Sequence, residues 1–144
     1  MTVYATENCI RVLDSQAKAD QFGEKIFCEI KPESEGLKFT VVKVSADKII
    51  VSQQNGIVKV YKLVITVDAG VTVAMNEVAR IELGSEVSAI CSYEEQEIHL
   101  IYVSLYDAPH FSLNILNLAA TELQLLARMP LTSILETSQT KKFY

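Results

Sequence analysis

The chain has 144 residues, of which 49% are hydrophobic and 22% charged, and its formal net charge at pH 7 is -5. The hydrophobic share excludes a disordered chain, and no apolar run approaches the roughly 20 residues that a membrane-spanning helix needs. The negative charge disfavours nucleic-acid binding, which requires clustered Lys and Arg to neutralise phosphates. The first residues lack both the basic region and the long apolar region of a signal peptide, so secretion is not indicated. Three widely spaced cysteines without a C-x-x-C pair fit reduced thiols, which predicts a nuclear or cytoplasmic protein.

Alternating apolar and polar residues, rich in β-branched side chains, predict strands along most of the chain. The first three expected strands are TVYA (2–5), CIRVLD (9–14) and KIFCEI (25–30). A group of four follows: FTVVKVS (39–45), IIVSQ (49–53), IVKVYKL (57–63) and, after a long loop at 64–76, EVARIEL (77–83). Asn55-Gly56 predicts a type I′ hairpin turn, because both residues tolerate the positive φ that this turn demands.

A second group of four strands is expected in the C-terminal half. It comprises EVSAICS (86–92), EIHLIYVS (97–104), FSLNILNL (111–118) and ELQLLARM (122–129), joined by the turn YEEQ (93–96), the loop LYDAPH (105–110) and a short loop. The segment 117–129 could instead form an amphipathic helix with Leu118, Leu125 and Leu126 on one side, but its place in the repeat favours a strand. SILETS (133–138) is typical of the first strand of a further group.

The two groups repeat with a period of about 45 residues, within the range of four-stranded propeller blades. This predicts an all-β fold of WD40-like β-propeller blades, with a partial blade at 1–36, blades at 37–83 and 84–129, and the start of another blade or a tail at 130–144. A closed propeller needs roughly four to eight blades. The prediction is therefore a partial or open propeller, and a β-sandwich is the alternative.

No residue pattern indicates catalysis, a metal or a cofactor. His99 and His110 have no nucleophile at motif spacing, and His99 is expected to be a hydrogen-bonded structural histidine. Cys9, Cys28 and Cys91 are too dispersed to supply the roughly four converging ligands of a zinc site. The glycines occur singly, so no phosphate-binding loop is present. The sequence predicts a protein that is not an enzyme and takes no small-molecule substrate.

Two connections have compositions that favour contact with other proteins. LYDAPHF (105–111) combines aromatic residues, an acid, a histidine and a proline, as binding hot spots often do; its alternative is a plain connection whose aromatic rings pack on the core. SYEEQ (92–96) offers an acidic patch to a basic partner. The alternatives for Glu94, Glu95 and Glu97 are a solvated turn, an acid/base pair or a metal site. The expected partner-binding residues are Tyr106, Asp107 and His110 in the first connection, and Tyr93, Glu94 and Glu95 in the second.

The stretch IIVSQQNGIVKVYKL (49–63) resembles the WD40-type hairpin, with Tyr61 at the position of that family's Trp. The order of segments along the chain is similar to that in the stretch entering the third propeller of a nuclear family. The segments are IRVLDS, KIFCEI, this hairpin, VARIELGSEVSAICSY, HLIYVSLYDAPHFSLNILNLAATELQLL and MPLTSILETS. That family comprises the large subunit of the damaged-DNA-binding complex, the largest subunit of cleavage and polyadenylation specificity factor, and a relative in splicing factor three-b.

The resemblance implies a non-catalytic scaffold whose propeller edges and loops bind other proteins, in one branch as an adaptor between a cullin ubiquitin ligase and its substrate receptors. It also favours a nuclear location and a role in ubiquitin ligation, DNA repair or RNA processing. Two alternatives stay open: a nucleic-acid-binding subunit of an RNA-processing or DNA-repair complex, and a generic WD40-like interaction module.

Overall fold

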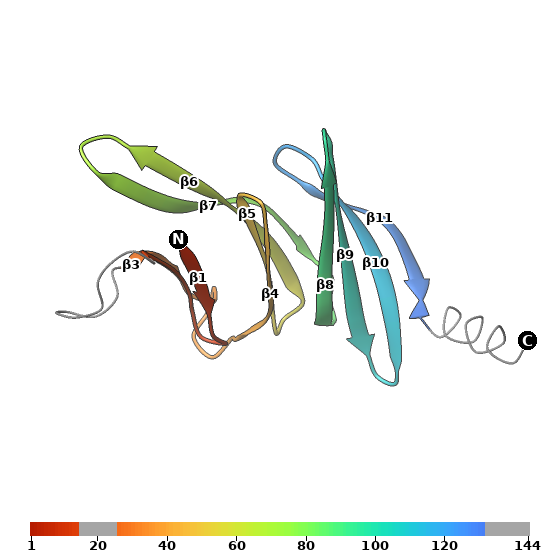
Figure 1. Ribbon diagram of the computed structural model, residues 1–144. Helices are drawn as coiled ribbons and strands as arrows, with labels where there is room; N and C mark the ends of the chain where they lie inside the picture. Colours follow the sequence, from red (N-terminus) through yellow and green to blue (C-terminus); the bar gives the residue numbers. More distant parts are fainter. Residues whose placement is uncertain (15–25, 132–144) are drawn as a thin grey trace, which may run out of the picture.

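The computed structural model describes residues 1–14 and 26–131, whose strands form three antiparallel sheets (Figure 1). The first sheet contains β1 (Thr2–Ala5), β2 (Ile10–Leu13) and β3 (Ile26–Ile30). The second contains β4 (Phe39–Ser45), β5 (Lys48–Gln53), β6 (Ile57–Val67) and β7 (Val71–Glu82). The third contains β8 (Glu86–Glu95), β9 (Ile98–Asp107), β10 (His110–Leu118) and β11 (Leu123–Pro130). The expected strand at 133–138 lies outside the described residues.

The all-β prediction is confirmed, and the helix alternative for 117–129 is wrong because this segment supplies β11 and the end of β10. The long loop expected at 64–76 is also wrong. β6 and β7 continue as a paired hairpin through Ile65↔Val73 and Val67↔Val71, because β-branched side chains keep the alternation going on both strands. The end of this hairpin extends past β5, which pairs with β6 only as far as Lys62 (Figure 1).

The other two expected loops are shorter than predicted. β8 continues to Glu95 and β9 to Asp107, which leaves tight turns where YEEQ and LYDAPH were expected to be connections. The β5–β6 hairpin is confirmed, but its type I′ turn is wrong, because Gly56 has a positive φ (83°) and Asn55 does not. Instead, the Gly56 N–H donates to the Gln53 carbonyl at 2.9 Å, which closes a turn that ends on a left-handed glycine.

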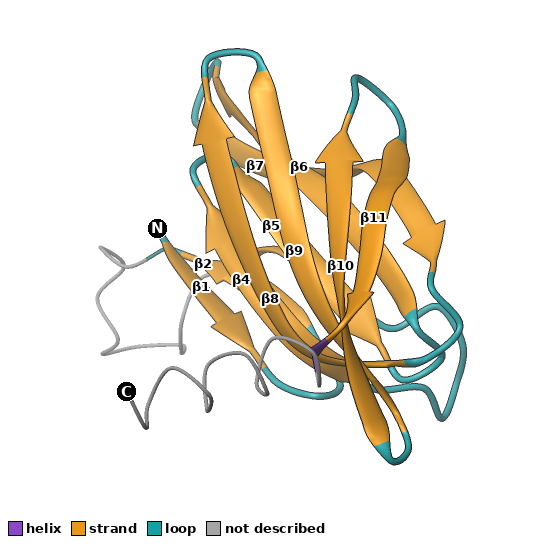
Figure 2. Cartoon of the chain, turned by 90° about the vertical axis from the view of Figure 1, so that its right-hand side faces the viewer, coloured by secondary structure: helices purple, strands orange, loops and turns teal. Residues whose placement is uncertain are grey.

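Within each sheet, strands that are consecutive in the chain are neighbours. Between sheets, most contacts join strands in corresponding positions: the first strands β4 and β8 contact each other, as do the last strands β3 and β7, and β7 and β11, while β8 also contacts β5. Figure 2, in which the third sheet faces the viewer, shows the strong twist of its strands. The sheets therefore succeed one another in the same orientation.

The described residues form two hydrophobic clusters, one on each face of the second sheet. Ile49 and Ile50 are neighbours on β5 and both are wholly buried, but Ile49 packs with the first sheet and Ile50 with the third. This follows from the period of two along a strand, which sends successive side chains to opposite faces. The second sheet is thus covered on both faces, which explains why β5 is buried from Ile49 to Gln53 and has three successive apolar residues at Ile49–Val51.

Candidate partner-binding site

The six residues expected to bind partners lie at opposite ends of the third sheet. Glu95 pairs with Ile98 at the β8–β9 turn, whereas Asp107 pairs with His110 at the β9–β10 turn. The length of β9 therefore separates the group of Tyr93, Glu94 and Glu95 from the group of Tyr106, Asp107 and His110. The two groups form two local surfaces.

The β9–β10 turn borders a cavity of about 510 Å³, here called the turn pocket. Its lining includes Leu105, Asp107, His110, Phe111, Ser112 and Arg128. Tyr106 lies against Phe111, with ring centroids 4.8 Å apart and planes tilted by 42°. Both rings are exposed, so an aromatic pair stands beside the pocket.

Arg128 is the residue of the turn pocket that sequence reasoning missed. It pairs with Asn114 across β10 and β11, and its Nε donates to Asn114 Oδ1 at 2.6 Å. Asn114 is wholly buried, and its Nδ2 donates to Ser112 Oγ at 3.1 Å. Because a buried amide is costly to leave unpaired, this arrangement holds the guanidinium in one orientation. The available signal was Asn114, a polar residue in the middle of the largely apolar strand FSLNILNL.

The turn pocket combines chemical features that suit a peptide. Leu105, only 2% exposed, provides an apolar floor, and Phe111 adds an aromatic surface. Arg128 and Asp107 bring opposite charges to the same cavity. Arginine and aromatic side chains are the groups most often found at the energetic centres of protein interfaces.

At the other end of the sheet, Tyr93 and Glu95 contact each other, whereas Glu94 contacts the second sheet. The Tyr93 hydroxyl donates to the Glu95 carboxylate, and this hydrogen bond raises the pKa of Tyr93. Glu94 instead accepts a hydrogen bond from Lys48 Nζ of β5 at 3.0 Å, and the same ammonium binds Asp47 Oδ1 at 3.1 Å. Glu94 is thus part of an ion pair that joins the second and third sheets.

His99 lies beside this ion pair and is only 4% exposed. Its Nδ1 is 3.9 Å from Glu94 Oε2, and neither ring nitrogen has a hydrogen-bond partner within 1–14 and 26–131. The expected hydrogen-bonded structural histidine is therefore not what the described residues show. Burial lowers the pKa of His99, and the nearby Lys48 acts in the same direction, while Glu94 opposes both.

The burial of His99 predicts a loss of stability in mild acid. The pKa of His99 in the folded state lies below 6.5, so the unfolded chain binds the proton more readily. The free energy of unfolding therefore keeps its full value above about pH 6.5 and falls as the pH drops through the folded-state pKa. The slope cannot exceed about 1.4 kcal/mol per pH unit for one group. Urea denaturation between about pH 7.5 and 5 should show this slope in the natural chain and a flatter profile in His99→Leu.

Carboxyl groups do not obscure that measurement. Hydrogen bonds to Arg80 and Lys48 lower the pKa values of Glu33 and Asp47 respectively, so their stabilising contributions are lost only in stronger acid. Parallel profiles for the natural chain and His99→Leu would contradict the assignment of the slope to His99.

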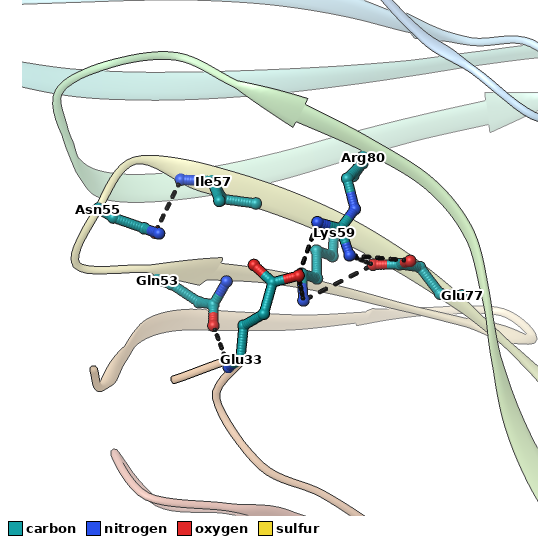
Figure 3. Close-up of polar contacts among 7 residues, drawn as sticks. All are labelled: Glu33, Gln53, Asn55, Ile57, Lys59, Glu77 and Arg80. Atoms are coloured by element: carbon teal, nitrogen blue, oxygen red, sulfur yellow. Dashed lines mark hydrogen bonds and ion pairs between the residues drawn. The ribbon is translucent and has the colours of Figure 1, made fainter. Parts of the chain in front are cut away.

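A buried lysine anchors a second charged group, which lies between the first and second sheets (Figure 3). Lys59 is 5% exposed, and its Nζ lies 3.4 Å from Glu33 Oε1 and 3.7 Å from Glu77 Oε1. Arg80 completes the group with hydrogen bonds to Glu33 at 2.7 Å and Glu77 at 2.9 Å. The Glu33 N–H also donates to the buried Gln53 Oε1 at 2.9 Å. These contacts fix the segment after β3 to β6 and β7, which is a structural role.

No group of three or more His, Cys, Asp or Glu side chains in the described part of the chain is placed to hold a metal ion. Nor does any helix among the described residues have the length and apolar character needed to cross a membrane. No protein-family model matches this chain, and no curated protein matches it. The fold and the turn pocket define an all-β protein of successive antiparallel sheets with a mixed apolar and charged pocket at a strand turn.

Proposed function

We propose that this protein is a non-catalytic scaffold of propeller type that binds another protein through the turn pocket. The observation that carries the proposal is the exposed Tyr106–Phe111 pair beside a cavity in which Arg128 is oriented by the buried Asn114. A rigid sheet positions these groups, and the binding surface is available without rearrangement of the core.

The arrangement of the sheets supports a propeller-type array. Corresponding strands of successive sheets meet, and the second sheet buries both faces, as an inner blade must. The resemblance to the nuclear propeller family supports a scaffold in a multisubunit complex of ubiquitin ligation, DNA repair or RNA processing.

The proposal predicts that removing the exposed groups of the turn pocket abolishes partner recovery. The variant Tyr106→Ala, Asp107→Ala, His110→Ala should bind a partner at least about tenfold more weakly, because truncated hot-spot residues cost more than about 1 kcal/mol each. Arg128 is left unchanged, since its removal would orphan Asn114 Oδ1. Affinity purification from nuclear extract, followed by a direct titration with the recovered protein, measures the effect.

A matched control is a variant with exposed charges removed elsewhere, Lys31→Ala with Asp68→Ala. Circular dichroism should be the same for all three chains. A partner that binds the turn-pocket variant as tightly as the natural chain would exclude this site. Recovery of nucleic acid, with an affinity that falls steeply with salt, would favour the nucleic-acid alternative instead.

A further inference from the structure

The face of β9 that packs on the second sheet begins with a histidine. Ile101, Val103 and Leu105 alternate along β9 and belong to the cluster between the second and third sheets. His99 stands two residues before Ile101, so its side chain is directed to the same face. The imidazole is therefore the first side chain of an otherwise apolar row, next to the β8–β9 turn.

Both nitrogens of this imidazole are enclosed without a partner. Neither Nδ1 nor Nε2 makes a hydrogen bond to any described residue, and both are shielded from solvent. An enclosed polar group without a partner costs free energy, and the cost rises steeply when the group is charged. No other molecule can reach these nitrogens while the two sheets are in contact. A partner for protonated His99 therefore has to come from the side chains that already surround it.

The charged side chains around His99 come from both sheets. A cavity of about 290 Å³ beside it is lined by Lys48 and Lys62 of the second sheet, and by Glu94 and Glu97 at the β8–β9 turn of the third. Asp47 is also close, because its carboxylate binds Lys48. The rest of the lining comes from β7, β10 and two turns and carries no charge. The cavity leaves the charged side chains room to change partners.

Glu94 lies between the imidazole and an ammonium group. Its Oε1 accepts a hydrogen bond from Lys48 Nζ at 3.0 Å, and its Oε2 lies 3.9 Å from His99 Nδ1. The two neighbours belong to different sheets. Lys48 is part of the second sheet, whereas His99 pairs directly with Glu94 across β8 and β9 of the third.

Protonation of His99 makes the two cations compete for Glu94. The imidazolium is only 4% exposed, and in the described part of the chain Glu94 is the acid placed to form an ion pair with it. Lys48 keeps Asp47 Oδ1 at 3.1 Å and is partly open to water. The loss of one partner costs such an ammonium group much less than an unpaired buried charge costs. The competition therefore favours His99.

We propose that protonation of His99 transfers the Glu94 carboxylate from Lys48 to His99, so that an ion pair between two sheets is replaced by one within the third sheet. The proton comes from solvent, and the imidazolium Nδ1–H then donates to Glu94 Oε2. The second and third sheets lose the Lys48–Glu94 ion pair at this end. Because burial lowers the pKa of His99, the exchange takes place in mild acid. This inference is separate from the turn pocket and does not depend on it.

An NMR titration of the natural chain first locates the protonation of His99. The chain has two histidines, so the signal that disappears in His99→Leu belongs to His99. We expect a midpoint between about pH 4.5 and 6.5, below the usual value of histidine and above the range in which carboxyl groups take up protons. A ring that stays neutral down to about pH 4.5 would overturn the proposal, because carboxylates would then be lost before the exchange.

A double-mutant cycle on Lys48 and Glu94 measures the exchange itself. The natural chain, Lys48→Met, Glu94→Gln and the double variant are unfolded with urea, one pH unit above and one below the His99 midpoint. Above the midpoint, the pair should change the unfolding equilibrium constant by about two- to fivefold, as ion pairs near a protein surface do. Below it, this coupling should disappear. In chains that also carry His99→Leu, the coupling should be the same at both pH values.

The matched control is the pair of Lys38 and Glu7, whose Nζ and Oε1 are likewise 3.0 Å apart. Its coupling should not change across the His99 midpoint, and any change would measure the protonation of carboxylates. Coupling between Lys48 and Glu94 that persists below the midpoint would show that the carboxylate holds both cations, and would overturn the exchange. An equal loss of coupling in the His99→Leu chains would overturn it as well.

A single variant keeps the proposal testable if the double variant does not fold. The destabilisation caused by Lys48→Met should then shrink below the His99 midpoint, and should stay constant when His99→Leu is also present. A destabilisation that is the same on both sides of the midpoint would overturn the proposal.

Discussion

Replacement of Ile101 by alanine should lower the free energy of unfolding by about 2–5 kcal/mol, the usual cost of deleting a large aliphatic side chain from a packed core. Ile101 is in the middle of β9, is wholly buried and belongs to the cluster that joins the second and third sheets. The cavity would lie within the apolar cluster between these two sheets. Urea denaturation followed by circular dichroism measures the loss.

Ile98→Ala is the matched control for this prediction. Ile98 is on the same strand but 56% exposed, so its truncation should change the free energy of unfolding by less than about 0.5–1 kcal/mol. If Ile101→Ala proves too unstable to purify, Ile101→Val should still cost about 0.5–1.5 kcal/mol. Equal effects of the two alanine variants would show that the cluster between these sheets is not the main source of stability.

Gly56→Ala is expected to be the most damaging of the glycine substitutions. Gly56 has a φ of +83°, and a Cβ added there would lie 2.8 Å from the Ser85 carbonyl oxygen and 2.9 Å from the Ser85 nitrogen. Both neighbours are backbone atoms of the segment between β7 and β8, which cannot move as a side chain can. The Leu83 N–H also donates to the Gly56 carbonyl at 3.0 Å, so displacing the turn would disturb this bond.

Gly84→Ala distinguishes the cost of the steric clash at Gly56 from the cost of the left-handed backbone conformation. Gly84 has a similar φ of +78°, but an added Cβ would meet nothing within 4 Å. Its substitution should cost only the roughly 1–2 kcal/mol of a left-handed conformation, and Gly56→Ala should exceed it because of the steric clash. Thermal and urea denaturation of both variants test this, and a loss at Gly84 as large as that at Gly56 would contradict the clash.

These two predictions concern the same junction. Ile101 lies in the cluster between the second and third sheets, and Gly56 touches the segment that links them. The mild-acid effect at His99 and the Lys48–Glu94 ion pair belong to this junction as well. The contact between these sheets is therefore where stability is expected to be most sensitive to substitution.

The candidate site could be predicted only in part. Asp107 and His110 were identified from the composition of one connection, and both line the turn pocket. Arg128 was not identified, because its position depends on pairing with Asn114 across two strands. Glu94 was expected to be a free acidic group, but Lys48, which is 46 residues away in sequence, forms an ion pair with it.

Local pattern was sufficient to locate the strands, since a period of two can be recognised from a few neighbouring residues; β1 and β4 have the predicted bounds. The same pattern did not show where a strand stops. β6 and β7 extend through the expected loop because each provides the other with a partner, which is a property of the pair and not of either segment. Strand length is decided by pairing.

Which sheets adjoin and which charges meet were decided only by the tertiary structure. Lys59 reads as an ordinary polar residue of a strand, yet packing against the first sheet buries it beside Glu33. Such features depend on contacts between residues far apart in the chain, and no local alternation of apolar and polar side chains encodes those contacts.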